Sequence, residues 1–444
     1  MASARGPRTA YIHIGAPKTG STAIQAVFSQ VGDALHAQGF HYLSGDRNHS
    51  ERLSLAFWDE EDAARLARFR WVEDPATFAR LRVETHEGLA DEIARAHPHD
   101  VIASAEELSE FTRDDVKRLM VFFALHVDRI RVIAYAREPV AWMNSAAQQS
   151  TKWSGDCLDD ILLHPRLPRY QARFQGFIDA TAPGDFILRP FGGSDVVADF
   201  SGVLGLPAPL TSRNVAQPLN ASVSHETAIM FSKINEVMPP FVDCRHNPCR
   251  AFSIIKDGRL PGRKFTLPRE TIEEHATAIA AERDWLNARL GHGVFSAPNL
   301  PTIGRREWFG PDRTALEDYA LTFLDKCRSA QNEAALKFML KALKQRDHAP
   351  EVAAALLDKA WLLSTDRWSM DMIAREGLAQ DRPDIEKYFL KQRIMRRVEA
   401  PLPDDAPLLI GNPFDRPWRT LPSNELGEQC SPSGPATKSP ELTV

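Results

Sequence analysis

A short segment near the N-terminus places the strictest limits on the fold, because it joins an apolar run to a glycine-containing loop and then to an amphipathic helix. It reads Tyr-Ile-His-Ile-Gly-Ala-Pro-Lys-Thr-Gly-Ser-Thr-Ala-Ile-Gln and spans residues 11–25. Gly15 and Gly20 let the backbone turn tightly and approach a ligand closely. The amides of residues 19–22 would lie at the helix start, where unpaired donors and the helix dipole favour an anion. The segment therefore predicts an anion-binding loop between a buried strand and a helix.

The position of the lysine separates this loop from the nucleoside-triphosphatase loop. That motif has Lys directly after the second Gly and before a Mg²⁺-binding Ser or Thr, whereas Lys18 precedes Gly20 by two residues. The hydroxyls of Ser21 and Thr22 would supply hydrogen-bond donors to the ligand, in addition to the amides of Thr19 and Gly20. The pattern favours a diphosphate-like group handled by Lys18 rather than by a metal ion. The plainer interpretation is a strand-to-helix turn with a solvated lysine.

Similar apolar runs predict further strands of one sheet. They are short, rich in Ile and Val and nearly continuous in apolar character, which is typical of strands covered on both faces. The predicted strands are Tyr11–Ile14, Val101–Ser104, Ile130–Ala136 and Phe186–Leu188. Helical patterns lie between them, at residues 22–31, 115–126 and 142–149. This alternation predicts an α/β fold with a P-loop-like parallel sheet flanked by helices.

The second half of the chain is predicted to be mainly helical. Residues 224–291 contain a long helix at 267–290, and a stretch rich in Pro and Gly at 297–313 marks a boundary. An all-helical C-terminal appendage is expected at 314–398, with helices at 314–330, 333–344, 349–363, 369–376 and 384–397 and polar turns between them. Repeats of the tetratricopeptide sort are an open alternative there. The predicted domains are 1–297, 314–398 and a disordered or loosely attached tail at 401–444.

Composition limits the class of protein. A net charge of −5 disfavours a general nucleic-acid binder. The N-terminus has no apolar signal region, and no stretch has the ~18 apolar residues that a membrane span needs, so a cytoplasmic location is expected. Five scattered cysteines make no disulfide framework. Cys244 and Cys249, with His246 between them, are interpreted as ordinary thiols rather than half of a zinc site, and no metal is expected.

A second motif follows the strand predicted at 130–136. Arg137 stands at the strand end, and Ser145 follows eight residues later in the next helix. An arginine offers a planar fork of donors to phosphate oxygens, and a serine hydroxyl adds another. Taken alone, an arginine at a strand end is common and is more often explained by a structural ion pair.

Together the two motifs resemble those of the sulfotransferases that use 3'-phosphoadenosine 5'-phosphosulfate (PAPS), in their bacterial, carbohydrate-type branch. The sequence Gly-Ala-Pro-Lys-Thr-Gly-Ser-Thr from Gly15 is similar to their 5'-phosphosulfate loop, and Arg137 and Ser145 match their 3'-phosphate residues. The resemblance covers about residues 9–295. It implies sulfuryl transfer from PAPS to an acceptor hydroxyl or amine, which we expect to be a saccharide, with Lys18 at the phosphosulfate.

The resemblance is incomplete in two places. The Arg-Lys-Gly segment that closes over the nucleotide in cytosolic aryl sulfotransferases is absent. Pro190 and Phe191 stand where members often carry Tyr-Glu, so Arg189 is given no role.

Two residues are candidates for the general base. Glu106 follows the strand at 101–104, at the edge where open α/β sheets bind ligands. Its competing role is structural, beside a capping box formed by Ser104 and Glu107. His49 lies in a polar loop, and its competing interpretation is a solvated histidine. His13, inside the first strand, is expected to be a packed core residue.

Two other functions stay open. One is a Mg²⁺-dependent, kinase-like phosphotransferase, which the lysine position disfavours. The other is a catalytically inactive nucleotide-binding scaffold, in which the helices at 314–398 would recruit a protein partner.

Overall fold

The computed structural model divides into two compact units. It describes residues 7–69, 74–193, 195–206, 210–211, 222–242, 245–247, 258–297, 300–310 and 313–365, together with Arg250, Ile254 and Ile373. Unit 1 takes the described residues within Met1–Ala146, Pro165–Ser222 and Arg269–Thr302. Unit 2 takes those within Ala147–His164 and Val223–Pro268 and those from Ile303 onward. The predicted tail at 401–444, and helices at 369–376 and 384–397, lie outside the described residues apart from Ile373.

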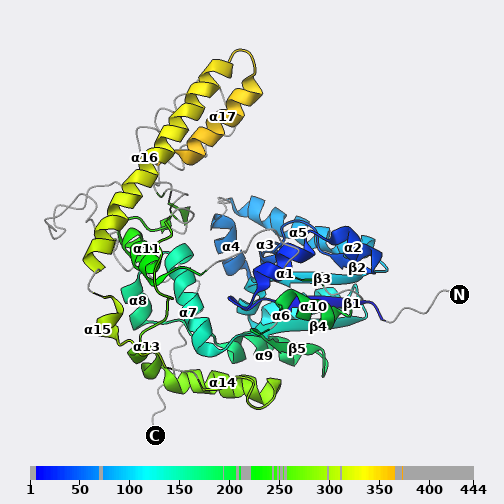
Figure 1. Cartoon of the computed structure of the whole chain (residues 1–444). Coiled ribbons are helices and arrows are strands. Elements are labelled where there is room, and N and C mark those ends of the chain that lie inside the picture. The colour runs from blue at the N-terminus through cyan, green and yellow to red at the C-terminus, as the bar shows by residue number, and fades with distance from the viewer. Residues whose placement is uncertain are drawn as a thin grey trace, which may run out of the picture. The chain divides into compact units, whose positions relative to one another are not determined.

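Unit 1 contains a five-stranded parallel sheet, which confirms the predicted α/β class (Figure 1). The strand order is β2-β3-β1-β4-β5, and every neighbouring pair is parallel. The strands are β1 Thr9–Ile14, β2 Phe40–Tyr42, β3 Asp100–Ala105, β4 Arg129–Ala136 and β5 Phe186–Pro190. In the central register Ile12 pairs with Ala103 on one side and with Val132 on the other. All six residues of β1 are buried, as its apolar run predicted.

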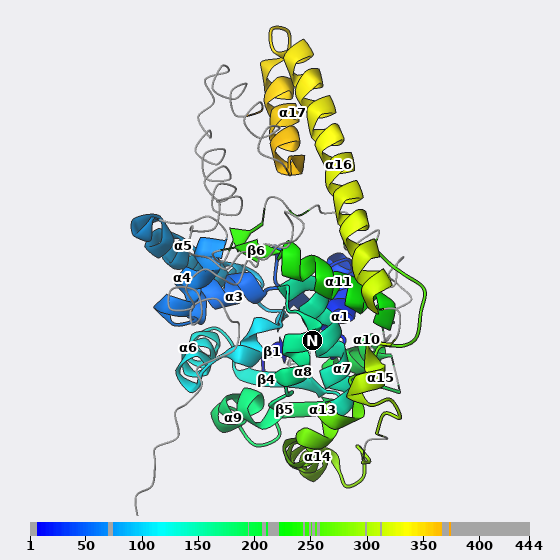
Figure 2. The ribbon, with the colours of Figure 1, turned by 90° about the vertical axis from the view of Figure 1, so that its left-hand side faces the viewer.

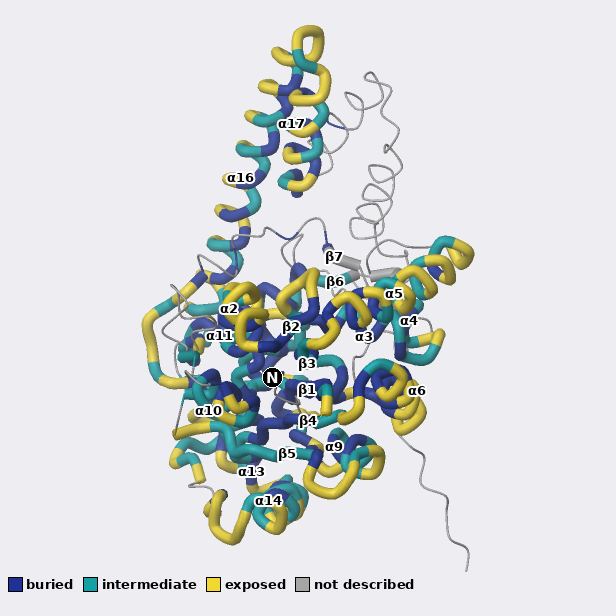
Figure 3. The backbone as a smooth tube through the Cα atoms, turned by 90° about the vertical axis from the view of Figure 1, so that its right-hand side faces the viewer, coloured by how far each residue is buried: buried dark blue, intermediate teal, exposed yellow. Residues whose placement is uncertain are grey.

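Helices cover both faces of the sheet (Figure 3). One face carries α1 Ser21–Phe28, α2 Gly32–Ala37 and α10 Val196–Leu204, whose Ile24, Leu35 and Phe200 share a core cluster with Tyr11 and Ile133 of the strands. The opposite face carries α6 Arg113–Ala124 and α9 Tyr170–Ala180. Unit 1 also contains α3 Ser50–Phe57, α4 Glu60–Phe69, α5 Pro75–Arg95, the short 3₁₀ helix η1 Glu107–Glu110, α13 Arg269–Glu274 and α14 Ala276–Leu290. The helix α7 Pro139–Gln149 begins in unit 1 and ends in unit 2.

The strand order defines where a ligand would bind. The chain leaves β1 for β2 at one edge of the sheet and leaves β4 for β5 at the other edge. In open α/β sheets, ligands bind outside the carboxyl ends of the strands, where the connections diverge in this way. The loops that follow β1 and β4 therefore flank the expected crevice.

Unit 2 is mainly helical in its described part. It contains η2 Ser150–Ser154, α8 Leu158–Leu163, α11 His225–Val237, α15 Arg305–Trp308, α16 Arg313–Gln345 and α17 Pro350–Leu363. The antiparallel pair β6 Phe241–Val242 and β7 Arg245–His246 interrupts the predicted helical stretch 224–291. The helices α16 and α17 lie side by side (Figure 2). No helix in the described ranges combines the length and apolarity needed to cross a bilayer.

Several predicted helix boundaries are wrong. The helices predicted at 314–330 and 333–344 are one continuous α16, because residues 313–345 contain neither Gly nor Pro and Gln331 is buried within the helix. The single helix predicted at 267–290 is two, since the chain turns at His275 between α13 and α14. The helix predicted at 22–31 ends at Phe28.

Candidate functional site

The loop from Gly15 to Gly20 folds back on itself directly after β1. The Gly15 amide donates to the Ala105 carbonyl of β3 at 3.0 Å, and the Thr19 hydroxyl donates to the Ala16 carbonyl at 2.6 Å. Lys18 and Gly20 both have left-handed backbones, with φ of 69° and 87°. A loop with positive φ at a non-glycine residue is held by its surroundings. The chain thus turns tightly enough to start α1 at Ser21.

The start of α1 offers hydrogen-bond donors to a ligand. The first amides of a helix have no intrahelical partner, and the positive end of its dipole lies there. Ser21 is 2% exposed, and its hydroxyl is buried without a hydrogen-bond partner in the described structure. That hydroxyl occupies the space that a Cβ at Gly15 would need, and the Cγ of Glu106 lies 3.2 Å from the same point. Glycine at position 15 is therefore what allows Ser21 and Glu106 to lie against the loop.

Glu106 follows β3, and a hydrogen bond from its backbone amide holds it in place. The Ser50 hydroxyl accepts from the amides of Glu106 at 2.7 Å and Glu107 at 3.1 Å. Burial, with repulsion from Glu107, raises the pKa of Glu106 to about 7, although the positive charge of Lys18 opposes the rise. A carboxylate whose pKa lies near neutrality is suited to proton transfer.

The predicted capping box of Ser104 and Glu107, which would give Glu106 a purely structural role, is not formed in the structure. Ser104 lies inside β3, and its hydroxyl bonds the Nδ1 of His13 at 2.8 Å. The helix η1 begins only at Glu107 and has no side-chain cap. His13 itself is fully buried between Tyr135 and Phe200, as expected of a core residue.

His49 is a buried structural residue rather than a solvated loop histidine. It is 1% exposed, its Nε2 donates to the Leu43 carbonyl at 2.8 Å, and its Nδ1 accepts from the Ser104 amide at 3.0 Å. Burial lowers its pKa to about 4. A histidine that acts as a general base needs a free ring nitrogen that faces the substrate. Since the backbone occupies both ring nitrogens, the geometry favours Glu106 over His49 as the base.

Arg137 lies at the end of β4, beside the start of α1. The Tyr170 hydroxyl accepts from the Arg137 amide and donates to its carbonyl, both at 2.9 Å. The guanidinium lies 5.7 Å from the centre of the Phe191 ring and donates no hydrogen bond to any residue that the structure describes. Burial lowers its pKa. A half-buried cation without an acceptor is suited to receive an anion.

Two aromatic residues connect Arg137 to the loop. A Cβ at Gly20 would lie 2.7 Å from the Phe191 ring, so this ring neighbours both the loop and Arg137. The Trp142 indole of α7 donates to the Pro17 carbonyl at 2.6 Å. Ser145 lies two turns into the same helix, partly buried, and its hydroxyl has no partner among the described residues. The structure thus brings Lys18, Glu106 and Arg137 to one edge of the sheet.

Sequence reasoning does not find Phe191, Trp142 or Ser50. A phenylalanine after a strand and a tryptophan in a helix carry no signal of their own, and each is assigned only by the contact that it makes in three dimensions. Arg189, which has no role in the sequence-based prediction, forms an ion pair with Asp199, which also accepts from the Tyr135 hydroxyl at 2.8 Å.

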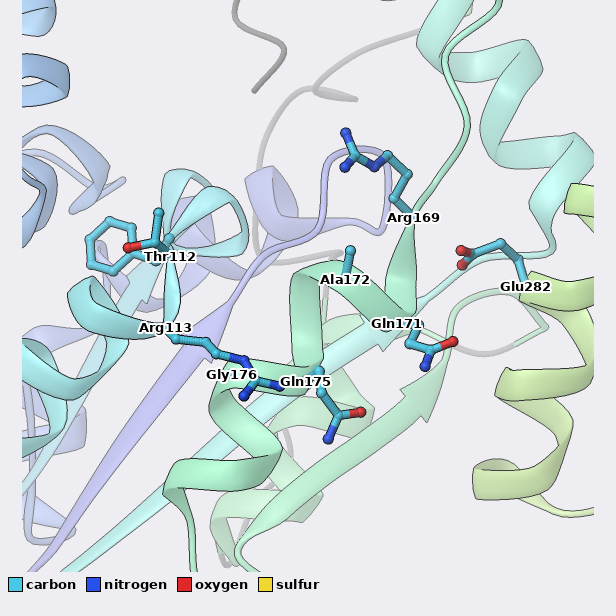
Figure 4. A pocket seen from close by; sticks show the side chains of 9 residues that line it. Thr112, Arg113, Arg169, Gln171, Ala172, Gln175, Gly176 and Glu282 are labelled. Atoms are coloured by element: carbon cyan, nitrogen blue, oxygen red, sulfur yellow. The ribbon is translucent and has the colours of Figure 1, made fainter. Parts of the chain in front are cut away.

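A pocket of about 510 Å³ lies between α6 and α9 in unit 1 (Figure 4). It is lined by Phe111, Thr112, Arg113, Arg169, Gln171, Ala172, Gln175, Gly176 and Glu282. The Glu282 carboxylate accepts from the Tyr170 amide at 2.7 Å, at the first turn of α9. None of the predicted site residues lines this pocket, so it neighbours the candidate site without containing it.

No protein-family model, curated protein or solved structure matches this chain. Among the described residues, no three His, Cys, Asp or Glu side chains gather as a metal site would require, and Cys244 and Cys249 lie outside those residues. The assignment of function therefore depends on the geometry of the site.

Proposed function

We propose that this protein is a PAPS-dependent sulfotransferase. One observation carries the proposal: the Lys18 loop at the end of β1 and the guanidinium of Arg137 at the end of β4, which has no acceptor among the described residues, both lie beside the Phe191 ring. A donor with anionic groups at both its 5' and its 3' positions needs two such cationic sites at one sheet edge. We also propose that the loop after β1 acts as a P-loop-like phosphate-binding loop.

The loop and α1 would bind the 5'-phosphosulfate. The amides at the start of α1, the unpartnered Ser21 hydroxyl and the Thr22 hydroxyl would donate to its oxygens, with Thr19 and Gly20 supplying further amides. Arg137 and Ser145 would bind the 3'-phosphate. Because the loop supplies charge and donors itself, this binding scheme has no step that requires a divalent ion.

The chemical step is an in-line displacement at sulfur. The acceptor oxygen forms a bond to sulfur while the bond from sulfur to the bridging phosphate oxygen breaks, and the acceptor proton passes to Glu106. Lys18 stabilises the negative charge that develops on the departing phosphate. Preorganised donors of this kind are worth about 3 kcal/mol each, and a general base contributes roughly 10²–10⁴-fold.

Three further parts of the proposal have other sources. The saccharide acceptor comes from the resemblance, the cytoplasmic location from the sequence composition, and recruitment of a protein partner from the predicted helical C-terminal appendage. The paired helices α16 and α17 in unit 2 support only the last of these, because they present an antiparallel helical surface.

Calorimetric titration of the full chain tests the nucleotide assignment. In buffer with chelator, 3'-phosphoadenosine 5'-phosphate should bind at least tenfold tighter than adenosine 5'-phosphate, because the 3'-phosphate gains a charge-assisted contact. Arg137→Ala should remove most of that difference. Equal affinity for the two nucleotides in the wild type, or binding and transfer that need Mg²⁺, would favour a kinase-like protein instead. Donor binding without any acceptor sulfation would favour an inactive scaffold.

A further inference from the structure

The pocket beside α9 has no role in the proposed reaction. Its volume of about 510 Å³ is within the usual range for small-molecule sites. Figure 4 shows the first turns of α9 along its middle, with Thr112 and Arg113 on one side and Glu282 on the other. All of its lining residues belong to unit 1, so its walls are positioned within one compact unit. It is therefore a second place at which unit 1 could bind a ligand.

The helix α9 presents different sides to the pocket and to the proposed nucleotide site. Gln171 and Gln175, which are one helical turn apart, both line the pocket. Tyr170 does not line it and is fully buried, with its hydroxyl bonded to the backbone of Arg137. The pocket and the proposed 3'-phosphate site are thus separate, although the same helix supports both.

Two positions that line the pocket carry residues that cost stability. Arg169 has φ of 52°, a left-handed backbone that is strained for any residue except glycine. Gly176 lies inside α9, where alanine would be more stable. A Cβ there would meet Val116 at 3.5 Å and Arg113 at 3.7 Å, which are ordinary contacts, so packing does not require glycine. Such departures from local preference are expected at functional sites.

Two opposite charges on the pocket walls lie near each other without forming an ion pair. The Arg169 guanidinium has no ion pair or hydrogen bond with any residue that the structure describes. Burial raises the pKa of Glu282, and the charge of Arg169 is among the groups that oppose the rise. Arg113, the other cation of the pocket, is already paired with Asp179 at 3.0 Å. One cation and one carboxylate are therefore left to face a ligand.

We propose that this pocket binds a small zwitterion of the size of a dipeptide. The carboxylate of the ligand pairs with Arg169, and its ammonium group pairs with Glu282. The Gln171 carboxamide, which has both a donor and an acceptor, hydrogen-bonds to the peptide group. The small residues Ala172 and Gly176 leave room for the ligand on α9. The site is additional to the nucleotide site proposed for unit 1, and its test requires neither nucleotide nor transfer activity.

Calorimetry on the full chain tests the two charges with three probes. Alanylglutamine carries both charges, its N-acetyl derivative lacks the ammonium group, and its C-terminal amide lacks the carboxylate. The dipeptide should bind about tenfold tighter than either derivative, because each derivative loses one charge-assisted hydrogen bond. Equal affinity for the three probes, or no binding of the dipeptide at millimolar concentrations, would overturn the proposal.

Substitutions at the two costly positions separate binding from stability. Arg169→Gly should raise the thermal midpoint, because glycine adopts the left-handed conformation without strain, and it should remove the preference for the dipeptide over its C-terminal amide. Gly176→Ala should also raise the midpoint but weaken dipeptide binding several-fold, since the added methyl group occupies part of the pocket. The matched control is Gly202→Ala on α10, an exposed position where a Cβ would meet no heavy atom within 4 Å. It should raise the midpoint and leave binding unchanged.

Two further variants locate the bound dipeptide. Glu282→Gln keeps an acceptor for the Tyr170 amide, so it should fold, and it should remove the preference for the dipeptide over its N-acetyl derivative. Arg137→Ala, at the proposed 3'-phosphate site, should leave the three affinities unchanged. If Arg137→Ala weakens the dipeptide as much as Arg169→Gly does, the dipeptide binds at the nucleotide site and the proposal is wrong. Failure of the nucleotide proposal alone would leave all of these binding results as expected.

Discussion

The Trp142 indole donates a hydrogen bond of 2.6 Å to the carbonyl of Pro17, which ties the first turns of α7 to the loop after β1. The bond crosses from the segment after β4 to the segment after β1, the two connections that diverge at the proposed crevice. Trp142 is 2% exposed, and the Arg173 guanidinium lies 6.0 Å from its ring. The loop that carries Lys18 is thus positioned by the same helix that carries Ser145.

Removing this bond should weaken donor binding without abolishing it. Trp142→Phe keeps much of the aromatic packing but leaves the Pro17 carbonyl without its donor. We expect 3'-phosphoadenosine 5'-phosphate to bind roughly 3–10-fold more weakly by calorimetry, the value of one buried hydrogen bond. Trp285→Phe is the matched control, because the Trp285 indole nitrogen is buried without a partner in the described structure. Equal effects of the two changes would show that the bond to Pro17 does not position the loop.

Lys18 should affect transfer more than nucleotide binding. In the proposed mechanism, Lys18→Met removes the charge that would stabilise the departing phosphate, a group whose negative charge grows in the transition state. We expect kcat to fall by about 10²–10³-fold, with a smaller loss in affinity for 3'-phosphoadenosine 5'-phosphate. Sulfate incorporation from labelled PAPS measures the first and calorimetry the second. Lys117→Met, at an exposed position on α6, should change neither. A Lys18→Met protein with normal turnover would remove Lys18 from the mechanism.

Gly20 is required by both its backbone and its neighbours. Its φ of 87° is strained for other residues, and a Cβ would lie 2.7 Å from the Phe191 ring. Gly20→Ala should lower the free energy of unfolding by about 2–4 kcal/mol, combining backbone strain and overpacking. Gly45→Ala is the control, because Gly45 has φ of 97° but no heavy atom within 4 Å of the point where a Cβ would lie, so it reports the backbone cost alone. Urea denaturation compares the two, and similar losses would mean that the Phe191 contact is unimportant.

Much of the sheet can be predicted from the sequence, because buried parallel strands carry long apolar runs. The runs predicted for β1, β3, β4 and β5 agree with the structure to within two residues at either end. The edge strand β2 escapes prediction, since Phe40–Tyr42 is only three residues long and contains a histidine. In α16, the polar pair Gln331 and Asn332 resembles a turn, although no helix-breaking residue is present.

The site is predictable only where the chemistry is local. The loop around Lys18 and the strand end at Arg137 can be recognised because short stretches of chain define them. The contacts that favour Glu106 over His49 as the base cannot be recognised in this way. They are made by Ser50, Leu43 and Ser104, which come together only in the folded chain.

His49 should matter for stability rather than for proton transfer. Because burial lowers its pKa from 6.5 to about 4, the unfolded chain binds the proton more tightly than the folded protein. His49 therefore stabilises the fold above pH 6.5, and this contribution is lost as the pH falls from 6.5 towards 4. His49→Ala should lower the free energy of unfolding at pH 8 by about 2–4 kcal/mol, since two backbone groups lose partners. The loss should shrink towards pH 4, and the pH dependence of kcat/KM should stay that of the wild type.

Glu106 should define the acidic limb of the activity profile. If Glu106 is the general base, as proposed, its pKa of about 7 means that kcat/KM should rise with pH through neutrality as the carboxylate forms. Glu106→Gln should lower kcat by about 10²–10⁴-fold and abolish that limb. Glu107→Gln should instead shift the limb to lower pH, because it removes the neighbouring charge that raises the pKa of Glu106. A merely structural Glu106 would give neither result.

The same pKa predicts an opposite effect of Glu106 on stability. The folded state holds the proton more tightly than the unfolded chain, whose carboxyl titrates near 4.5, so stability falls as the pH rises from 4.5 through about 7. Glu106→Gln removes this fall, and at pH 8 it should be more stable than the wild type by about 1–3 kcal/mol. Urea denaturation at pH 5 and pH 8 measures the difference. A variant that is inactive yet more stable above neutrality is expected when a site that disfavours the charged carboxylate is kept for its reaction. Equal stability of the two proteins at both pH values would contradict this role.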